Sequence, residues 1–258
     1  MTSLSLAGQT ILLTGGLGAL AEHLLKKLSG AGANLVVTDI LSPDQATQKF
    51  RSWDISPDRC TYLPMDVTVM ADVESVLSQV FERFPRCDTV IGHAGGCDLH
   101  DFARTEAKTF ERIFRFNFLA QANLARAVLG HWTSADIPGH LIFTSSYVAT
   151  VPHRGISAYA SAKAALENFA RCLALEYATA GVRVNCVAPG NVAAGSSLRV
   201  YEENSEYRTF VDQVTPNGRR NSPQGVADAY LFLCSSLAAE WNGQTLHVDH
   251  GLTIPKIG

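Results

Sequence analysis

The sequence contains little charge and no strong excess of either sign. Charged residues make up 17% of its 258 residues, and the formal net charge is −3. A nucleic-acid-binding surface usually carries clustered lysine and arginine, whereas Arg219-Arg220 is the only adjacent arginine pair in this chain. We therefore expect no nucleic-acid partner, and we expect this pair to lie on the surface of a loop.

Long hydrophobic runs are also missing. Hydrophobic residues make up 47% of the chain, yet none of its segments reaches the roughly 18 consecutive apolar residues of a membrane span. Residues 1–6 lack the charged start and the long apolar stretch of a signal peptide. We expect no membrane partner and a cytoplasmic location.

The six cysteines do not form a metal-binding or disulfide pattern. They are scattered, without a Cys-x-x-Cys pair and without a histidine at zinc-ligand spacing, at positions 60, 87, 97, 172, 186 and 234. Most of them lie in apolar runs, where a reduced cysteine behaves as a small hydrophobic residue. We expect structural cysteines and no bound metal.

Strand and helix patterns alternate along the whole chain, without internal repeats or a linker. Apolar, partly β-branched runs predict strands near 10–14, 34–39, 60–65, 88–92, 139–145, 182–187 and 245–248. Helical patterns fill the intervals, including one over 157–180 that Gly181 closes. Such alternation requires parallel strands with right-handed crossovers, so the chain is predicted to be a single-domain α/β protein. Ligands of such sheets bind at the carboxyl ends of the strands. Those ends carry Thr14, Asp39, Asp66, Gly92, Ser146 and Pro189.

The first 40 residues resemble half of a nucleotide-binding sheet. The strand at 10–14 runs into Gly15-Gly16-Leu17-Gly18, a helix follows, and the next strand ends in Asp39. Glycines allow close approach of a diphosphate, and a helix N-terminus offers free N–H groups to it. The Asp39 carboxylate would accept hydrogen bonds from an adenosine ribose and repel a 2′-phosphate, which favours NAD over NADP.

A possible proton-transfer group follows the fifth predicted strand. Tyr159 and Lys163 are four residues apart on a predicted helix and therefore share one face of it. An ammonium so close would lower the tyrosine pKa and allow proton exchange with an alcohol or a carbonyl near neutral pH. Ser146, thirteen positions before Tyr159, would hydrogen-bond the same substrate oxygen.

These segments together resemble the short-chain dehydrogenase/reductases over essentially the whole chain. The matching segments, in order, are Thr14-Gly15-Gly16, Asp66-Val67-Thr68, Ala94-Gly95, Asn117, Ser146, Tyr159-x-x-x-Lys163, Pro189-Gly190 and Gly243-Gln244 with Val248-Asp249. The resemblance implies a Rossmann-type, doubly wound, seven-stranded parallel sheet with helices on both faces. It also implies a nicotinamide cofactor and a catalytic set of Asn117, Ser146, Tyr159 and Lys163.

The resemblance assigns further roles within this set. Lys163 would hydrogen-bond the nicotinamide ribose, and Asn117 would hold a water that links Lys163 to solvent. Asp66 would lie beside the adenine, with capping of the following helix as an alternative or additional role. The expected cofactor-binding residues are Gly15, Gly18, Leu20, Asp39, Asp66, Val67, Ala94, Gly95, Tyr159, Lys163, Pro189, Gly190 and Val192.

Several residues depart from the family pattern. The second and third glycines of the usual Thr-Gly-x-x-x-Gly-x-Gly turn fall on Ala19 and Ala21, and a Cβ there would approach the diphosphate. The usual Asn-Asn-Ala-Gly reads Gly92-His93-Ala94-Gly95. Ala194 replaces the threonine that contacts the nicotinamide carboxamide in family members.

A long segment over 191–217 occupies the place of a short strand-to-helix connection. Such excursions are often substrate-binding lids, and this one is polar. Together with His153-Arg154, it favours a hydroxylated or anionic small substrate, such as a sugar, a polyol or a hydroxy acid. The expected substrate contacts are Ser146, His153 and Tyr159.

The sequence as a whole predicts an NAD-dependent enzyme that interconverts a secondary alcohol and a ketone. Two alternatives on the same scaffold remain. One is a weakly catalytic nucleotide-binding or regulatory protein, and the other is a halohydrin dehalogenase-like lyase, against which Lys163 and Asp39 argue. The broad apolar stripe of the helix over 157–180 predicts a subunit interface. By resemblance, this helix would pair subunits into a homotetramer.

Overall fold

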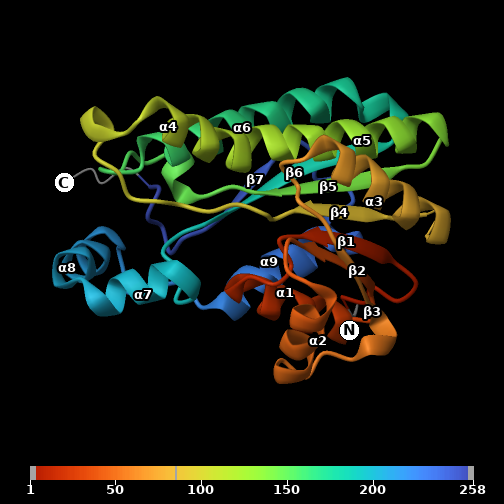
Figure 1. Cartoon of the computed structure of the whole chain (residues 1–258), viewed down its shortest axis with the longest axis horizontal. Helices are drawn as coiled ribbons and strands as arrows, with labels where there is room; N and C mark the ends of the chain where they lie inside the picture. The colour runs from red at the N-terminus through yellow and green to blue at the C-terminus, as the bar shows by residue number, and fades with distance from the viewer. Residues whose placement is uncertain (1–3, 85, 255–258) are drawn as a thin grey trace.

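The computed structural model describes residues 4–84 and 86–254, which contain one sheet of seven parallel strands (Figure 1). The strand order is β3-β2-β1-β4-β5-β6-β7. The strands are β1 (Thr10–Thr14), β2 (Asn34–Asp39), β3 (Cys60–Pro64), β4 (Thr89–Gly92), β5 (Gly139–Thr144), β6 (Val182–Pro189) and β7 (Thr245–Val248). Each lies at its predicted place, with ends shifted by at most two residues. The predicted doubly wound fold is confirmed.

Helices cover both faces of the sheet (Figure 1). One face carries α1 (Ala19–Gly30), α2 (Pro43–Ser52) and α9 (Pro223–Cys234). The other face carries α3 (Met70–Arg83), α4 (Ala107–Phe114), α5 (Ala120–Ser134) and α6 (Ser157–Glu176). A short π-helical turn over Arg115–Leu119 joins α4 to α5. The strand order changes direction between β1 and β4: β2 and β3 follow on one side of β1, and β4 to β7 lie on the other. In a doubly wound sheet, a ligand crevice is expected at this point.

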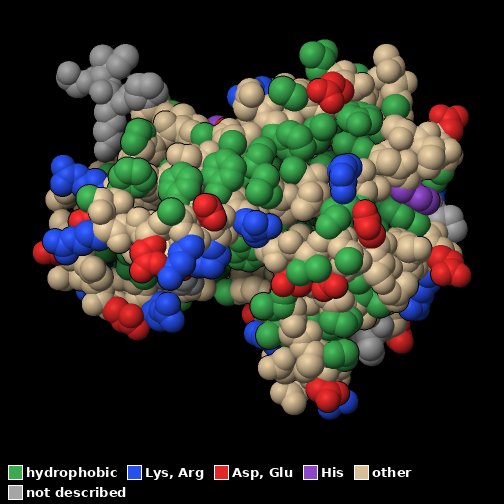
Figure 2. All heavy atoms as spheres, turned by 45° about the horizontal axis from the view of Figure 1, so that its top comes forward, with side chains coloured by type: hydrophobic (Ala, Val, Ile, Leu, Met, Phe, Trp, Pro, Cys, Tyr) green, Lys and Arg blue, Asp and Glu red, His purple; other side chains and the backbone are tan. Residues whose placement is uncertain are grey.

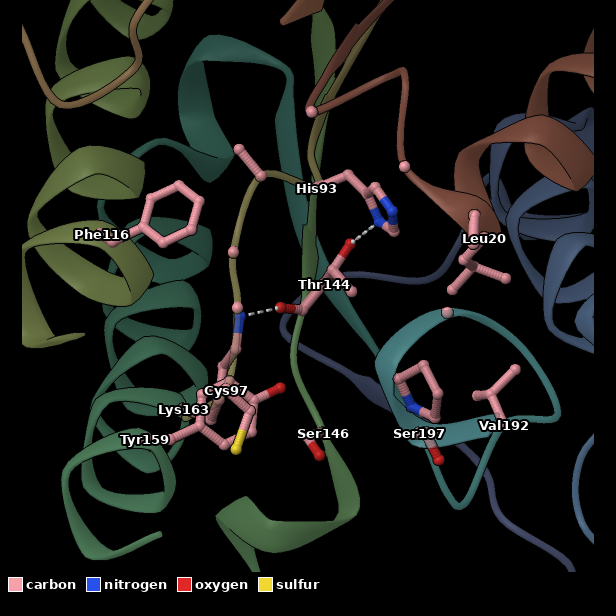
Figure 3. A pocket seen from close by; sticks show the side chains of 18 of the residues that line it. Leu20, His93, Cys97, Phe116, Thr144, Ser146, Tyr159, Lys163, Val192 and Ser197 are labelled. Carbon is pink, nitrogen blue, oxygen red and sulfur yellow. Dashed lines mark hydrogen bonds between the residues drawn. The ribbon is translucent and has the colours of Figure 1, made fainter. Parts of the chain in front are cut away.

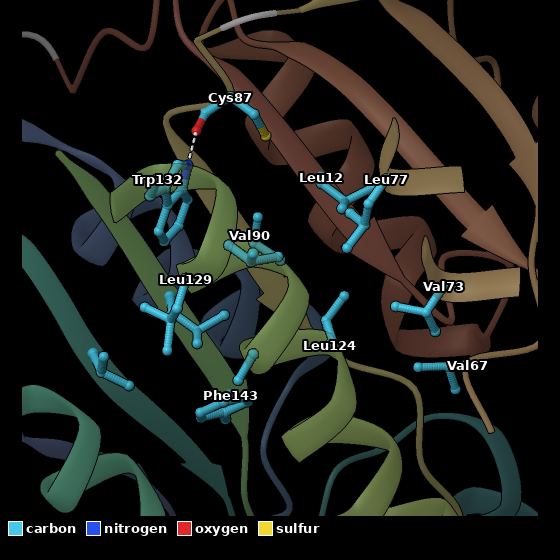
Figure 4. Packing of buried hydrophobic residues seen from close by; sticks show 14 of the residues in the cluster. Leu12, Val67, Val73, Leu77, Cys87, Val90, Leu124, Leu129, Trp132 and Phe143 are labelled. Atoms are coloured by element: carbon cyan, nitrogen blue, oxygen red, sulfur yellow. Dashed lines mark hydrogen bonds between the residues drawn. The ribbon is translucent and has the colours of Figure 1, made fainter. Parts of the chain in front are cut away.

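Each face of the sheet has its own apolar core. Under α3, α5 and α6, strand residues such as Leu12 and Val90 pack against Leu77, Leu124 and Trp132 (Figure 4). The Trp132 indole is fully buried, and its Nε1 donates a hydrogen bond to the Cys87 carbonyl at 3.0 Å. Under α1 and α9, a second core forms around the fully buried Tyr230. Both cores hold the strand ends in fixed positions.

The long helix predicted over 157–180 ends earlier than expected. The α-helix stops at Glu176, and a 3-10 turn over Ala178–Ala180 follows. Gly181 closes this turn at φ 72°, as predicted, but it caps the 3-10 turn instead of the α-helix. The tighter turn is needed because β6 begins at the next residue and runs back along the sheet.

The segment over 191–217 folds into two helices beyond the ends of the strands. These are α7 (Gly195–Glu203) and α8 (Ser205–Val214), drawn at the lower left of Figure 1. They lie at the carboxyl side of the sheet, so the predicted lid segment stands beside the ligand crevice.

Candidate active site

A cavity of about 690 Å³ lies at the carboxyl ends of β1, β2, β4, β5 and β6. Nearly all of the predicted site residues line it. Three groups can be distinguished along it: an end with Asp39 and Asp66, a middle with the turn before α1, and an end with Ser146 and Tyr159.

The turn before α1 depends on two glycines for close packing. Gly15 has φ 63°, and a Cβ there would lie 2.7 Å from the Ala94 Cα. A Cβ on Gly16 would lie 2.3 Å from the Val37 Cγ1. Gly18 occupies the N-cap of α1, which has no side-chain capping bond. The first N–H groups of the helix are therefore available to an anion.

The two alanines of this turn point in different directions. Ala19 lines the cavity, whereas Ala21 is fully buried in the core under α1. Ala21 therefore presents no Cβ to the cavity, because a residue and its second neighbour lie on different faces of a helix. One extra Cβ, at Ala19, remains beside the cavity.

Two carboxylates, Asp39 and Asp66, line one end of the cavity. Asp39 accepts hydrogen bonds from the amides of Leu17 at 3.0 Å and Ile40 at 2.8 Å. Asp66 accepts from the amide and the hydroxyl of Thr68 at 2.8 and 2.7 Å. Both carboxylates line the cavity, as does Val67.

The alternative capping role of Asp66 is not found. Helix α3 has Val69 at its N-cap, with no side-chain capping bond. The carboxylate of Asp66 instead stabilises the local turn around Thr68, while Asp72 reaches back to the Asp66 amide at 3.3 Å. The distance along the chain explains the difference, since Asp66 precedes the helix by four residues.

Asn117 ties the π-helical turn to the end of β4. Its Nδ2 donates to the carbonyls of Gly96 and Ile113 at 2.8 and 2.9 Å, and its Oδ1 accepts from the Gly96 amide at 3.1 Å. The side chain is fully buried. A Cβ on Gly95 would lie 2.8 Å from the Asn117 Oδ1 and 3.2 Å from the Lys163 Nζ. The structure thus brings Asn117 and Lys163 to either side of Gly95, while the water-holding role remains a prediction.

Ser146, Tyr159 and Lys163 meet at the other end of the cavity (Figure 3). Helix α6 places the two long side chains one turn apart, and the Lys163 Nζ lies 5.5 Å from the centre of the Tyr159 ring. Lys163 is 2% exposed, and its Nζ donates to the Thr144 carbonyl at 2.8 Å. The Ser146 hydroxyl acts on the Tyr159 phenol as a neighbouring hydrogen-bonding group. The predicted arrangement of these three groups is present.

The predicted direction of the tyrosine pKa is wrong. Burial raises the pKa of Tyr159 above its ordinary value of 10, the nearby Cys97 adds to this, and the interaction with Ser146 offsets only part of it. Burial also lowers the pKa of Lys163 to about 8. The two groups share a poorly hydrated site, which disfavours the charged form of each.

The end of β6 and the residues after it line another part of the cavity. Pro189, Gly190 and Val192, which were expected to bind the cofactor, are in this lining. Gly190 is needed there, because a Cβ would lie 2.6 Å from the Asn221 Oδ1. Ala194, also in the lining, is the N-cap of α7 and offers no side-chain hydrogen bond.

Only part of the polar lid segment faces the cavity. The lining residues from α7 and α8 include Ser197, Val200 and Tyr207. The charged residues of these helices are exposed and lie outside the lining: Arg199, Glu202, Glu203, Glu206, Arg208 and Asp212. His153 lines the cavity and packs edge-on against Phe210 of α8, with ring centres 4.9 Å apart.

Arg220 was expected on a loop surface but is half-buried against α7. Its Nη2 donates to the Val192 carbonyl at 2.5 Å and to the Ser197 Oγ at 3.2 Å. Its guanidinium also lies 4.5 Å from the centre of the Tyr201 ring. Arg219, in contrast, is exposed as predicted. Arg220 therefore holds α7 against the chain that enters α9.

Sequence reasoning missed several lining residues. Cys97, Thr144, Tyr147, Asn191, Ser197 and Tyr207 all line the cavity without belonging to a recognised motif. Their position next to motif residues was the available signal for Cys97, Thr144, Tyr147 and Asn191. For Tyr207, the only signal was its place in the predicted lid segment over 191–217, and the fold of α8 brings its side chain to the cavity.

Comparisons with known proteins identify the family. A family model described as enoyl-(acyl carrier protein) reductase matches residues 17–253. The chain belongs to the short-chain dehydrogenase/reductases. The members of this family are oxidoreductases that use a nicotinamide cofactor, and the uncapped α1 terminus and the glycine-lined cavity fit such a group.

Individual relatives differ in what they act on. The chain is 26% identical to glucose 1-dehydrogenase of Gluconobacter oxydans (strain 621H), covering 96% of this chain and 93% of the relative. It is 29% identical to a 3-oxoacyl-[acyl-carrier-protein] reductase of Vibrio cholerae serotype O1, covering 96% and 99%. A gluconate 5-dehydrogenase from Burkholderia cenocepacia, solved with NADP and tartrate, superimposes with a TM-score of 0.90 at 25% identity, covering 98% of both chains.

Residues 4–84 and 86–254 show neither a membrane span nor a metal-binding cluster. They contain no helix with the length and hydropathy that crossing a membrane demands. They also contain no group of three or more histidine, cysteine or acidic residues arranged to hold a metal ion. All six cysteines are free, with three of them buried.

Proposed function

We propose that this short-chain dehydrogenase/reductase is an NAD(H)-dependent enzyme that interconverts a secondary alcohol and a ketone. The observation that carries the proposal is the meeting of Ser146, Tyr159 and Lys163 at one end of the cavity. A bound nicotinamide would supply the acceptor or donor of hydride, which none of these side chains can be.

Tyr159 acts as the general acid or base at the substrate oxygen. In the reduction of a ketone, the neutral phenol donates its proton to the developing alkoxide, and Ser146 orients that oxygen by a hydrogen bond. Because burial raises the phenol pKa, the donor form is present at neutral pH. Oxidation of an alcohol needs the phenolate, so its rate is expected to rise with pH.

Lys163 stabilises the phenolate and anchors the cofactor. Its ammonium is fixed by the Thr144 carbonyl close to the Tyr159 ring. From the same position, it would donate a hydrogen bond to the nicotinamide ribose. Asn117 keeps the neighbouring Gly96 backbone in place through two hydrogen bonds, and a third ties it to the Ile113 carbonyl.

The cofactor is proposed to be NAD. Asp39 lines the adenosine end, where its negative charge opposes a 2′-phosphate. Among the described residues lining the cavity, Lys163 is the one lysine or arginine, and it lies at the opposite end. No cation in the lining is therefore placed to offset the charge of a 2′-phosphate.

The substrate is proposed to be a small hydroxylated compound, namely a sugar or a polyol, with a hydroxy acid as a weaker candidate. Ser197, Tyr207 and His153 offer hydrogen-bonding groups at the substrate end. The aromatic ring of Tyr207 can also cover the C–H face of a sugar. A carboxylate would find no arginine among the residues that line this end.

We further propose a cytoplasmic homotetramer with α7 and α8 as its substrate lid. Leu119 and Leu175 are exposed on the face formed by α4, α5 and α6, over which hydrophobic side chains gather (Figure 2). Leu175, 82% exposed on α6, lies within the stripe that predicted a subunit interface. Pairing of this face in a second copy would bury it.

A turnover assay tests the proposed function. Purified protein would be mixed with NAD and a panel of polyols, sugars and hydroxy acids, and NADH formation followed by absorbance. We expect turnover of at least one secondary alcohol, abolished in Tyr159→Phe. NADH binding without turnover of any member, in either direction, would favour the nucleotide-binding alternative.

A further inference from the structure

His93 connects three strand ends at the middle of the cavity. Its amide donates to the Thr14 Oγ1 at 3.0 Å, and its Nδ1 is 2.9 Å from the Thr144 Oγ1 (Figure 3). Thr144 Oγ1 in turn lies 2.6 Å from the hydroxyl of the buried Tyr230. The imidazole is therefore fixed in orientation by a hydrogen-bonded chain that ends in the core.

The second ring nitrogen of His93 is free for a ligand. Within the described residues, Nε2 has no hydrogen-bond partner, and it is not among the buried polar atoms. The ring lies in the cavity lining on the side that faces Leu20, in the first turn of α1 (Figure 3). If Tyr230 donates to Thr144 and Thr144 donates to Nδ1, Nε2 carries the proton and is a donor.

This part of the cavity is otherwise poor in polar side chains. The surrounding lining consists of Gly15, Gly18, Ala19, Leu20 and Ala94. The Thr14 hydroxyl already accepts from two amides, of His93 and Ala94. A dinucleotide that stretches from Asp39 to Tyr159 must place its diphosphate here, against the uncapped α1 terminus.

We propose that the His93 Nε2 donates a hydrogen bond to the diphosphate of the bound dinucleotide, opposite the N-terminus of α1. The proposal rests on the nucleotide-binding part of the proposed function and not on the alcohol–ketone chemistry. It gives this chain a side-chain anchor for the diphosphate that complements the backbone donors of the turn.

The same contact couples cofactor binding to protonation of the His93 ring. Burial and the charge of Lys163 lower the pKa of His93 to about 4, so the ring is neutral at pH 7. A diphosphate at Nε2 favours the imidazolium and raises this pKa in the complex. The titratable groups near the ring are Lys163 on α6 and Tyr230 on α9, and both keep one protonation state between pH 5.5 and 7. Binding in this range should therefore take up protons through His93.

Calorimetric titration with ADP-ribose and with adenosine tests the contact without any turnover. Adenosine lacks the diphosphate and serves as the matched ligand. At pH 7, His93→Leu should weaken ADP-ribose binding about tenfold, the value of one hydrogen bond to a charged group, and leave adenosine binding within about twofold. If the variant bound both ligands equally more weakly, or bound both with unchanged affinity, the proposal would be overturned.

The pH dependence separates hydrogen bonding from titration. His93→Gln keeps an N–H donor near the position of Nε2 but cannot titrate. Between pH 7 and pH 5.5, the wild type should gain about threefold or more in affinity for ADP-ribose, while the affinity of His93→Gln should not change with pH. Identical pH profiles of the two proteins would refute the coupling. A protein that shows these binding results but no alcohol turnover would refute the proposed catalysis alone.

Discussion

The carboxylate of Asp39 accepts a hydrogen bond from the amide of Leu17 at 3.0 Å. This bond joins the end of β2 to the turn before α1, so the residue proposed to face the adenosine ribose also supports the turn proposed to face the diphosphate. We therefore expect replacement of Asp39 to change cofactor choice and the turn together, unless the new side chain keeps the acceptor.

Asp39→Asn should change cofactor preference with the turn kept intact. The amide oxygen can still accept from Leu17, while the charge that repels a 2′-phosphate is lost. Repulsion of about 2.7 kcal/mol in the wild type corresponds to a hundredfold preference for NAD in kcat/KM. We expect the variant to narrow this gap mainly by better use of NADP, measured with both cofactors and one alcohol.

Asp39→Ala is the companion variant. It should also use NADP better, but it should lose NAD affinity and melt at a lower temperature, because the Leu17 amide loses its partner. Equal use of both cofactors by the wild type would contradict the proposed role of the carboxylate.

Tyr159→Phe should abolish proton transfer to the substrate and leave cofactor affinity nearly unchanged. The phenyl ring keeps the position beside Lys163, while the hydroxyl that interacts with Ser146 is lost. We expect kcat to fall by roughly 10²–10⁴-fold and the Kd for NADH to change by only a few fold. Single-turnover kinetics and fluorescence titration measure the two quantities. Retention of more than about a tenth of the activity would exclude Tyr159 as the acid/base group.

Lys163→Met should stabilise the folded protein while destroying activity. Burial lowers the pKa of Lys163 from 10.5 to about 8 in the folded protein. The charged form of this side chain therefore destabilises the folded state relative to the unfolded chain. The unfolded chain binds more protons between pH 8 and 10.5, which means that this group's contribution to stability rises with pH in that window. Below pH 8, the full destabilisation of about 3 kcal/mol remains.

The variant should therefore melt above the wild type at pH 7, with a gap that narrows as the pH rises from 8 to 10. Thermal unfolding at several pH values measures this gap. The lost hydrogen bond to Thr144 reduces the gain but does not depend on pH. A gap that is constant from pH 7 to 10 would show that Lys163 does not titrate in this range.

Arg220→Gln should loosen the lid. The guanidinium bonds the Val192 carbonyl and the Ser197 Oγ and covers the Tyr201 ring. We expect a several-fold higher KM for the substrate and faster proteolysis within α7 and α8, with the Kd for NADH little changed. Arg219→Gln is the matched control, since this neighbouring arginine is exposed. Equal effects of both variants would exclude a specific lid contact.

Leu175→Glu should weaken assembly. Leu175 is 82% exposed on α6, and a buried charge at a subunit interface is unfavourable. We expect the wild type to sediment as a tetramer at micromolar concentration and the variant to shift toward smaller species. A monomeric wild type would contradict the proposed assembly.

Much of the fold followed from local patterns in the sequence. Short apolar runs alternating with helical periodicity predicted all seven strands. The signal is strongest in the five inner strands, because a strand covered on both faces is largely apolar along its length. The same patterns placed Asp39, Ser146 and Pro189 at strand ends. In a parallel sheet these ends share one edge, so the crevice was predictable before any contact was known.

The tertiary structure decided what depends on burial and on distant neighbours. The direction of the Tyr159 pKa was mispredicted, since spacing along a helix shows that a lysine is near but not how poorly both groups are hydrated. The contacts of Arg220, the inward turn of Ala21 and the cavity position of Tyr207 likewise arise from packing between separate elements. Sequence periodicity fixes which face of an element is apolar, whereas desolvation and long-range contacts exist only once those faces have come together.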